Sequence, residues 1–138
     1  MKVYSIIIVV CFLVFSSLSF AGLYPDEFPV VIVDNGDGTG SAEGSMLHAR
    51  TSDNEFEKIG CWVKARYDLV DVSLVGFCEA RDSTDTRRVC VTHAPGLIDV
   101  VHGMGEFGKV EFEWNADSDC TFIQYSKTSQ WLPKFKAK

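Results

Sequence analysis

The chain has 138 residues, with 13 Lys and Arg against 19 Asp and Glu, and a formal net charge of −6. An acidic chain repels phosphate backbones and anionic lipid, so composition argues against nucleic acid and membrane surfaces as partners. The length suits one domain with a buried core and gives no indication of a second one.

The first 21 residues have the pattern of a cleaved signal peptide. Lys2 precedes an apolar run from Val3 to Phe15, and Ser19-Phe20-Ala21 places small residues at the two positions that a signal peptidase reads. The run is shorter than the roughly 20 apolar residues that a membrane-spanning helix needs. We therefore expect residues 1–21 to be removed and residues 22–138 to form a single secreted or periplasmic domain without a membrane anchor.

Short β-strands separated by turns fill the first half of the expected domain. Phe28 to Val33 is rich in β-branched residues, and the aspartate- and glycine-rich stretch 34–40 after it indicates a hairpin. Alternating side chains from Gly44 to Arg50 predict the next strand. Phe56 to Tyr67 alternates less regularly, and we interpret it as a strand with Ile59, Cys61 and Val63 on one side.

The second half continues this pattern, with one interruption. Pro95 suits a first helical turn and Gly103 a C-cap, so Ala94 to His102 is predicted as a short helix. Four further segments predict strands: Val72–Ala80, Arg87–Thr92, Phe107–Trp114 and Cys120–Tyr125. About seven strands without repeated crossover helices predict a mainly β fold, an antiparallel β-sandwich or open barrel with one short helix.

Four cysteines remain after the leader, which takes Cys11 with it, and an even number in an exported chain indicates disulfides. Hairpins about residues 69–70 and near Thr84 would set Cys61 opposite Cys78 and Cys78 opposite Cys90. A Cys61–Cys90 bridge would then skip a strand and span about 9.5 Å, beyond disulfide reach. Two pairings remain: Cys61–Cys78 with Cys90–Cys120, which we favour, and Cys78–Cys90 with Cys61–Cys120.

Two short segments repeat the pattern Ala-Arg-x-Ser, at residues 49–52 and 80–83. Arg50 and Arg81 could act as paired guanidinium groups for a carboxylate or sulfate ligand. The alternative is that each arginine pairs with local acids while the serine closes a side-chain turn, and we favour this structural interpretation.

No pattern in the chain predicts a cofactor, a metal or a catalytic set. The cysteines form no C-x-x-C motif, so zinc binding and thiol catalysis are not indicated. The loop from Asp34 to Glu43 resembles a calcium loop only loosely, because the alternating ligands and the closing glutamate are absent. The three histidines, His48, His93 and His102, are widely separated in the sequence, and we expect no enzyme.

Aromatic side chains are the best candidates for a binding surface, because they bury large areas and carry a polar end. Alternation turns Trp62 away from Cys61 and Val63. Trp62 and Tyr67 are our first candidates for binding residues. Trp114 shares a face with Val110 and Phe112 and is expected in the core. Tyr125 and Trp131 are further aromatics of the same kind.

A combination of motifs spans nearly the whole expected domain: Gly44-Ser45, Ala49-Arg50-Thr51-Ser52, Ile59-Gly60-Cys61, Cys78 to Ser83, Cys90, Trp114, Cys120-Thr121 and Pro133-Lys134. This combination resembles an uncharacterised group of small exported bacterial proteins. The resemblance implies a bacterial exported domain and supplies no ligand or catalytic residue.

The sequence therefore favours a non-catalytic binding module for a protein or a glycan, acting through an exposed strand edge or an aromatic face. The alternative is a periplasmic or secreted inhibitor or immunity protein that binds a cationic enzyme through the acidic loops 82–85 and 117–119. A hydrolase whose residues meet only in the fold is the third hypothesis.

Overall fold

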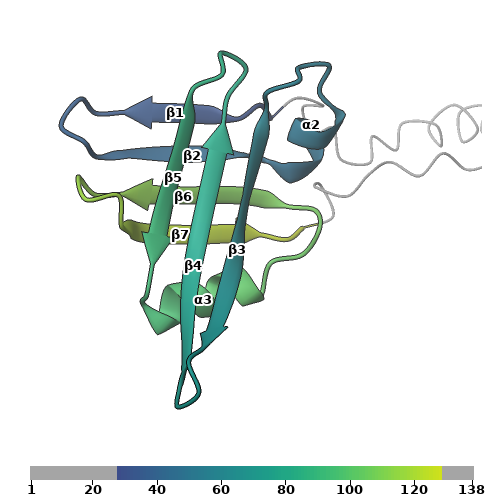
Figure 1. Ribbon diagram of the computed structural model, residues 1–138. Helices are drawn as coiled ribbons and strands as arrows, with labels where there is room; N and C mark the ends of the chain where they lie inside the picture. Colours follow the sequence, from purple (N-terminus) through teal and green to yellow (C-terminus); the bar gives the residue numbers. More distant parts are fainter. Residues whose placement is uncertain (1–27, 129–138) are drawn as a thin grey trace, which may run out of the picture.

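The computed structural model describes residues 28–128, which form seven strands in two antiparallel sheets together with two helices (Figure 1). The expected mainly β architecture of about seven strands is confirmed, and it is an open two-sheet arrangement, not a closed barrel. The expected leader and Trp131 lie outside the described residues.

The larger sheet has the strand order β1-β2-β6-β7. Its strands are β1 (Val31–Asp34), β2 (Gly40–Ser45), β6 (Lys109–Trp114) and β7 (Cys120–Ser126). The predicted hairpin between β1 and β2 forms because Gly36 and Gly38 adopt positive φ angles of 81° and 90°, which glycine tolerates without strain. The side chain of Asp34 fixes the same turn by accepting the backbone N–H of Gly36.

The smaller sheet has the order β3-β4-β5 and consists of β3 (Lys58–Tyr67), β4 (Val72–Arg81) and β5 (Arg87–Thr92). The ten residues of β3 pair with all ten of β4, whereas β5 extends along β4 only as far as Gly76. The turn end of the β3–β4 hairpin is therefore a two-stranded ribbon that projects below the rest of the domain in Figure 1.

The strands of the two sheets cross at a steep angle, and the core lies between the facing surfaces (Figure 1). Val110 and Phe112 on β6 are fully buried against Cys78 and Ala80 on β4. As predicted, a helix begins at a proline and ends before Gly103: it is α3 (Pro95–His102), whose buried side chains are Ile98 and Val101.

The expected strand from Gly44 to Arg50 is wrong in its second half. β2 ends at Ser45, and a short helix, α2 (Met46–Thr51), follows directly. Ser45 caps this helix, because its hydroxyl accepts the backbone N–H of His48. The residues from Met46 to Arg50 include no β-branched side chain, so local propensity favours the helix once the cap forms.

Two disulfides connect the strands with the favoured pairing, which is thereby confirmed. Cys61 and Cys78 bridge β3 to β4 within one sheet, and Cys90 and Cys120 join β5 to β7 and so link the two sheets. The predicted register is also confirmed, because Cys78 lies opposite both Cys61 and Cys90. Such bonds are typical of proteins in oxidising compartments. Within residues 28–128, no helix is both long and apolar enough to cross a membrane.

Candidate functional site

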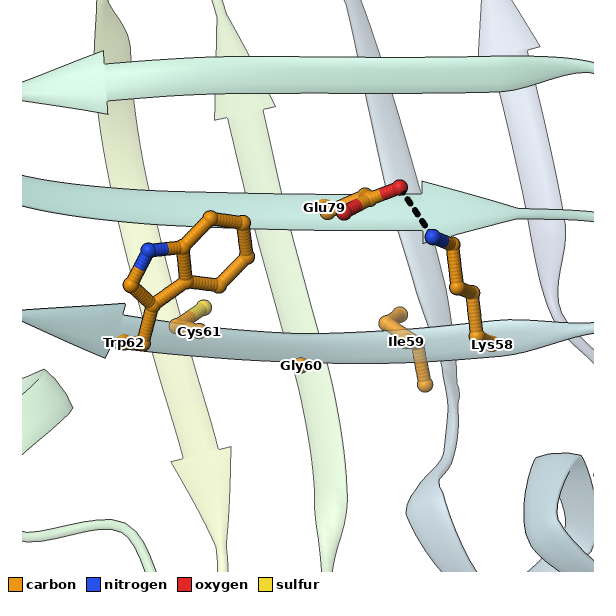
Figure 2. A pocket seen from close by; sticks show the side chains of 6 residues that line it. All are labelled: Lys58, Ile59, Gly60, Cys61, Trp62 and Glu79. Carbon is orange, nitrogen blue, oxygen red and sulfur yellow. Dashed lines mark ion pairs between the residues drawn. The ribbon is translucent and has the colours of Figure 1, made fainter.

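Trp62 lies on the outward face of the smaller sheet. Ile59 and its odd-numbered neighbours in β3 face the core, so alternation directs Trp62 away from it, as predicted. The indole is 46% exposed and stacks on Phe77 of β4, with ring centroids 5.5 Å apart and an interplanar angle of 11°. Figure 2 looks onto this face and shows the flat side of the indole turned toward the viewer.

A shallow pocket of about 190 Å³ lies beside the indole. Gly60 forms its floor, and Lys58, Trp62 and Glu79 stand around it (Figure 2). Ligand pockets for whole small molecules usually exceed about 300 Å³, so this hollow has room for a single ring or side-chain-sized group of a larger ligand.

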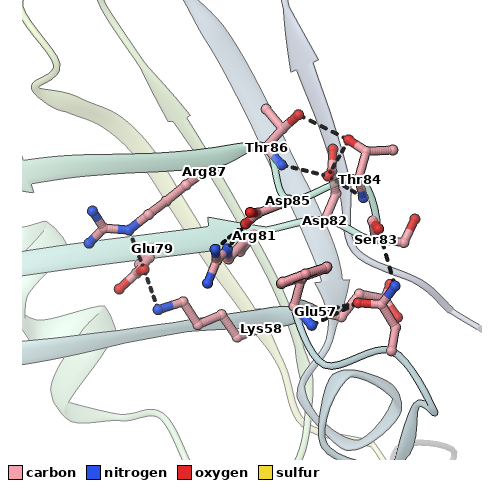
Figure 3. A network of polar contacts seen from close by, with 12 residues as sticks. Glu57, Lys58, Glu79, Arg81, Asp82, Ser83, Thr84, Asp85, Thr86 and Arg87 are labelled. Carbon is pink, nitrogen blue, oxygen red and sulfur yellow. Dashed lines mark hydrogen bonds and ion pairs between the residues drawn. The ribbon is translucent and has the colours of Figure 1, made fainter.

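Glu79 supplies the one carboxylate of the pocket. Its Oε1 accepts from Lys58 Nζ at 2.5 Å and from Arg87 Nε at 2.6 Å, whereas no hydrogen bond among the described residues reaches Oε2 (Figure 3). Partial burial pushes the pKa of Glu79 upward, but the hydrogen bonds from Arg87 and Lys58 outweigh it and hold the pKa below its usual value. Glu79 is therefore ionised at neutral pH.

Tyr67, the other preferred aromatic residue, does not share a face with Trp62. The two lie five positions apart on β3, so alternation places them on opposite faces of the ribbon. Tyr67 is 66% exposed, and its hydroxyl donates to the carbonyl of Leu69 at the ribbon's tip.

Arg50 and Arg81 each have a local partner. The guanidinium of Arg50 lies 5.6 Å from the centre of the Phe107 ring. Arg81 forms an ion pair with Asp85 and lies 5.1 Å from the centre of the Phe56 ring. No interaction within residues 28–128 joins the two arginines, an arrangement that agrees with the structural interpretation of the repeated motif.

The acidic loop 82–85 is organised by hydrogen bonds within its own turn (Figure 3). Asp82 Oδ1 accepts the backbone N–H groups of Thr84 and Thr86 as well as the Thr84 hydroxyl. These bonds lower the pKa of Asp82 in spite of an opposing effect of burial. In loop 117–119, Asn115 caps the turn by accepting the backbone N–H groups of Asp117 and Asp119. Hydrogen bonds within the turns thus account for Asp82 and Asn115.

The groups considered for metal binding have other partners. The sulfurs of Cys78, Cys90 and Cys120 lie within 4.8 Å of one another, but all three belong to disulfides and are not available as thiolate ligands. In the loop resembling a calcium site, Asp34 pairs with Arg88 and Glu43 with Lys109.

His48 belongs to a separate polar cluster around a buried glutamate. Glu57 accepts the backbone N–H of Val30 and the hydroxyl of Ser52, and His48 Nε2 lies 3.7 Å from the same carboxylate. This arrangement connects the start of β1 to α2 and β3, which is a structural role. His93 and His102 are exposed at other positions in the chain.

Sequence reasoning identified Trp62 but missed the residues that complete its surroundings. Phe77 and Glu79 lie directly opposite Trp62 and Gly60 in the sheet register. The register predicted from Cys61 and Cys78 contained this information, because Trp62 and Gly60 are the immediate neighbours of Cys61.

Comparison with known protein families, with curated proteins and with solved structures finds no match for this chain.

Proposed function

We propose that this protein is an exported bacterial domain, secreted or periplasmic, that binds a glycan on the outer face of the smaller sheet and catalyses no reaction. The observation that carries the proposal is the half-exposed, flat indole of Trp62 beside a hollow with room for one ring. An aromatic ring stacks on the apolar C–H face of a sugar, while charged groups nearby hydrogen-bond its hydroxyls.

The polar groups of the hollow suit such a ligand. Oε2 of Glu79 is an acceptor with no hydrogen bond from the residues described, and the ammonium of Lys58 can donate more than one bond. Their mutual ion pair holds both groups in place beside the indole, so that little side-chain entropy is lost when a sugar binds.

Several features support binding without catalysis. Glycoside hydrolysis uses two carboxyl groups about 5–9.5 Å apart, of which the general acid has a raised pKa. Glu79 is the one carboxylate that lines the hollow, and its pKa is lowered. A carboxyl group of this kind is a poor proton donor at neutral pH.

A glycan array probed with oxidised protein lacking residues 1–21 tests the proposal. We expect binding to at least one class of glycan and a loss of roughly tenfold or more in affinity for Trp62→Ala, since stacking of this kind contributes on the order of 1–2 kcal/mol. Phe122→Ala is the matched control, because Phe122 is also an exposed aromatic residue but lies on the larger sheet.

A second variant tests the hollow itself. A Cβ atom at Gly60 would meet nothing closer than Met46 at 3.9 Å, so Gly60→Val should fold normally and fill the hollow. Binding should then fall with little change in stability. Unchanged glycan binding in both Trp62→Ala and Gly60→Val, or no binding by the wild-type protein, would contradict the proposal.

A further inference from the structure

The projecting end of the β3–β4 ribbon exposes an unusual amount of apolar surface. Leu69 and Val70 at the tip are 85% and 92% exposed, and Val72 beside them is 56% exposed. Tyr67 and Leu74 extend this surface along the ribbon's inner side, beyond the edge of the domain core. Contiguous apolar patches of this size on soluble proteins mark interaction surfaces.

The ribbon also has a free backbone edge. The Cα atoms of Cys61 and Cys78 are 4.0 Å apart, a spacing typical of a non-hydrogen-bonded pair, so the N–H and C=O groups of Cys61 point away from β4. By alternation, Val63, Ala65 and Tyr67 direct theirs to the same outer edge. No backbone hydrogen bond from the described part of the chain reaches that edge. An open strand edge is a template for another strand.

Basic and acidic side chains occupy separate parts of the ribbon. Lys64 and Arg66 are exposed in the part of β3 nearest the tip, with no ion pair among residues 28–128, and Asp68 and Asp71 flank the tip. An antiparallel neighbour with the same sequence, related by a two-fold axis at Arg66, would place its Asp68 beside Lys64 of this ribbon. The surface is therefore complementary to itself. The two aspartates also oppose insertion of the tip into an anionic membrane.

We infer that the free edge of β3 pairs with the β3 edge of a second copy of this chain, in an antiparallel, two-fold symmetric dimer. The exposed surface of Tyr67, Leu69 and Val70, which lie on β3 or in the turn after it, amounts to roughly 400 Å² in each copy, so the pair can bury about 800 Å² from these residues, an area in the range of weak, reversible interfaces. A two-fold contact of this kind uses the same surface on both subunits.

The dimer joins two ribbons into one continuous sheet. Because a two-fold axis perpendicular to that sheet keeps each face on its own side, Trp62 of both copies lies on one surface. The association does not depend on what Trp62 binds, but it makes that surface bivalent toward a repeating ligand.

Sedimentation velocity of the oxidised protein without residues 1–21, from about 1 μM to about 1 mM, tests this dimer. We expect a concentration-dependent monomer–dimer equilibrium for the wild type. The double variant Leu69→Asp/Val70→Asp should raise the dissociation constant at least about tenfold. The matched control is Val31→Asp/Val33→Asp, which places two charges on the exposed edge strand β1 and should leave the dimer intact.

Charge-reversal variants distinguish a second copy of this chain from any other partner. Lys64→Glu should weaken the dimer, and adding Asp68→Lys should restore it, because the two positions meet across the two-fold axis. A wild-type protein that stays monomeric at about 1 mM would overturn the inference. A dimer that survives Leu69→Asp/Val70→Asp with the native circular dichroism spectrum would overturn it as well.

Discussion

The two sheets each contain a tryptophan paired with a phenylalanine, and the two pairs have opposite environments. Trp114 on β6 is 5% exposed and lies at 49° to Phe112, with ring centroids 5.9 Å apart, inside the core. Trp62 on β3 stacks on Phe77 with nearly half of its surface in solvent. Core packing accounts for the first pair, whereas the second is a cross-strand pair that leaves much of the indole open to solvent.

A glycine near each tryptophan shows the same difference. Gly40 lies opposite Trp114 in the β2–β6 register, and a Cβ atom there would overlap the Trp114 ring and the carbonyl of Val33. Gly60, beside Trp62, has ample space above it. The first glycine is needed for packing, whereas the second leaves a surface hollow that packing does not demand.

The largest expected effect follows from the buried pair. Phe112→Ala should lower the free energy of unfolding by about 3–5 kcal/mol, because it opens a cavity in the fully buried core. Phe77→Ala, the matched change in the half-buried pair, should cost clearly less. Urea denaturation followed by circular dichroism measures both, and similar losses would mean that the two pairs do not differ as described.

The disulfide between the sheets should have the next largest effect. It closes a separation of 30 residues, so Cys90→Ala/Cys120→Ala should lose about 3–4 kcal/mol. The bridge within the smaller sheet closes 17 residues, and Cys61→Ala/Cys78→Ala should lose slightly less on the same loop-entropy basis. The same denaturation experiment compares them. No loss from either double variant would show that the cross-links are not needed for stability.

Substitutions of Gly40 and Gly60 should differ in their effect on stability. Gly40→Ala should cost about 1–3 kcal/mol, since it forces the backbone or Trp114 to shift. Gly60→Ala should change stability by less than about 0.5 kcal/mol. Thermal melting of the two variants measures this difference. Equal melting temperatures would show that Gly40 is no more tightly packed than Gly60.

The last prediction concerns the pH dependence of stability. Because the pKa of Glu79 is lowered in the folded state, the unfolded state binds more protons in acid, and the stability contributed by its ion pairs is lost as pH falls through the folded pKa. That contribution is fully present above about pH 5 and amounts to about 1 kcal/mol or less. Glu79→Gln should therefore show a shallower loss of stability between about pH 5 and pH 2. Identical acid profiles for the two proteins would contradict the ion-pair geometry.

Local patterns in the sequence were sufficient to predict most of the fold. Gly36, Gly38 and Asp85 occupy the positive-φ positions of two hairpin turns, whereas Leu69 and Ser118 occupy those of the other two. The positions of Cys61, Cys78 and Cys90 predicted both the register and the favoured pairing. The helix α2 was missed because a short alternation of apolar residues fits a strand as well as one helical turn. The cap by Ser45 decided between them.

The candidate site was only partly accessible from sequence. Alternation placed Trp62 outward, but Trp62 and Tyr67 were grouped together although they lie on opposite faces of β3. The projection of the ribbon depends on where the larger sheet and β5 end relative to β4, which is a property of the three-dimensional arrangement. Local sequence carries no signal for it.

Nuclear magnetic resonance of the indole N–H groups shows directly whether a glycan binds at Trp62 on the outer face of the smaller sheet. Oxidised ¹⁵N-labelled protein without residues 1–21, with its indole resonances assigned by Trp62→Phe and Trp114→Phe, is titrated with an oligosaccharide that the array identifies. We expect the Trp62 resonance to shift on titration while that of Trp114 stays in place. A shift confined to Trp114, or no shift at Trp62 at saturating oligosaccharide, would contradict binding at Trp62.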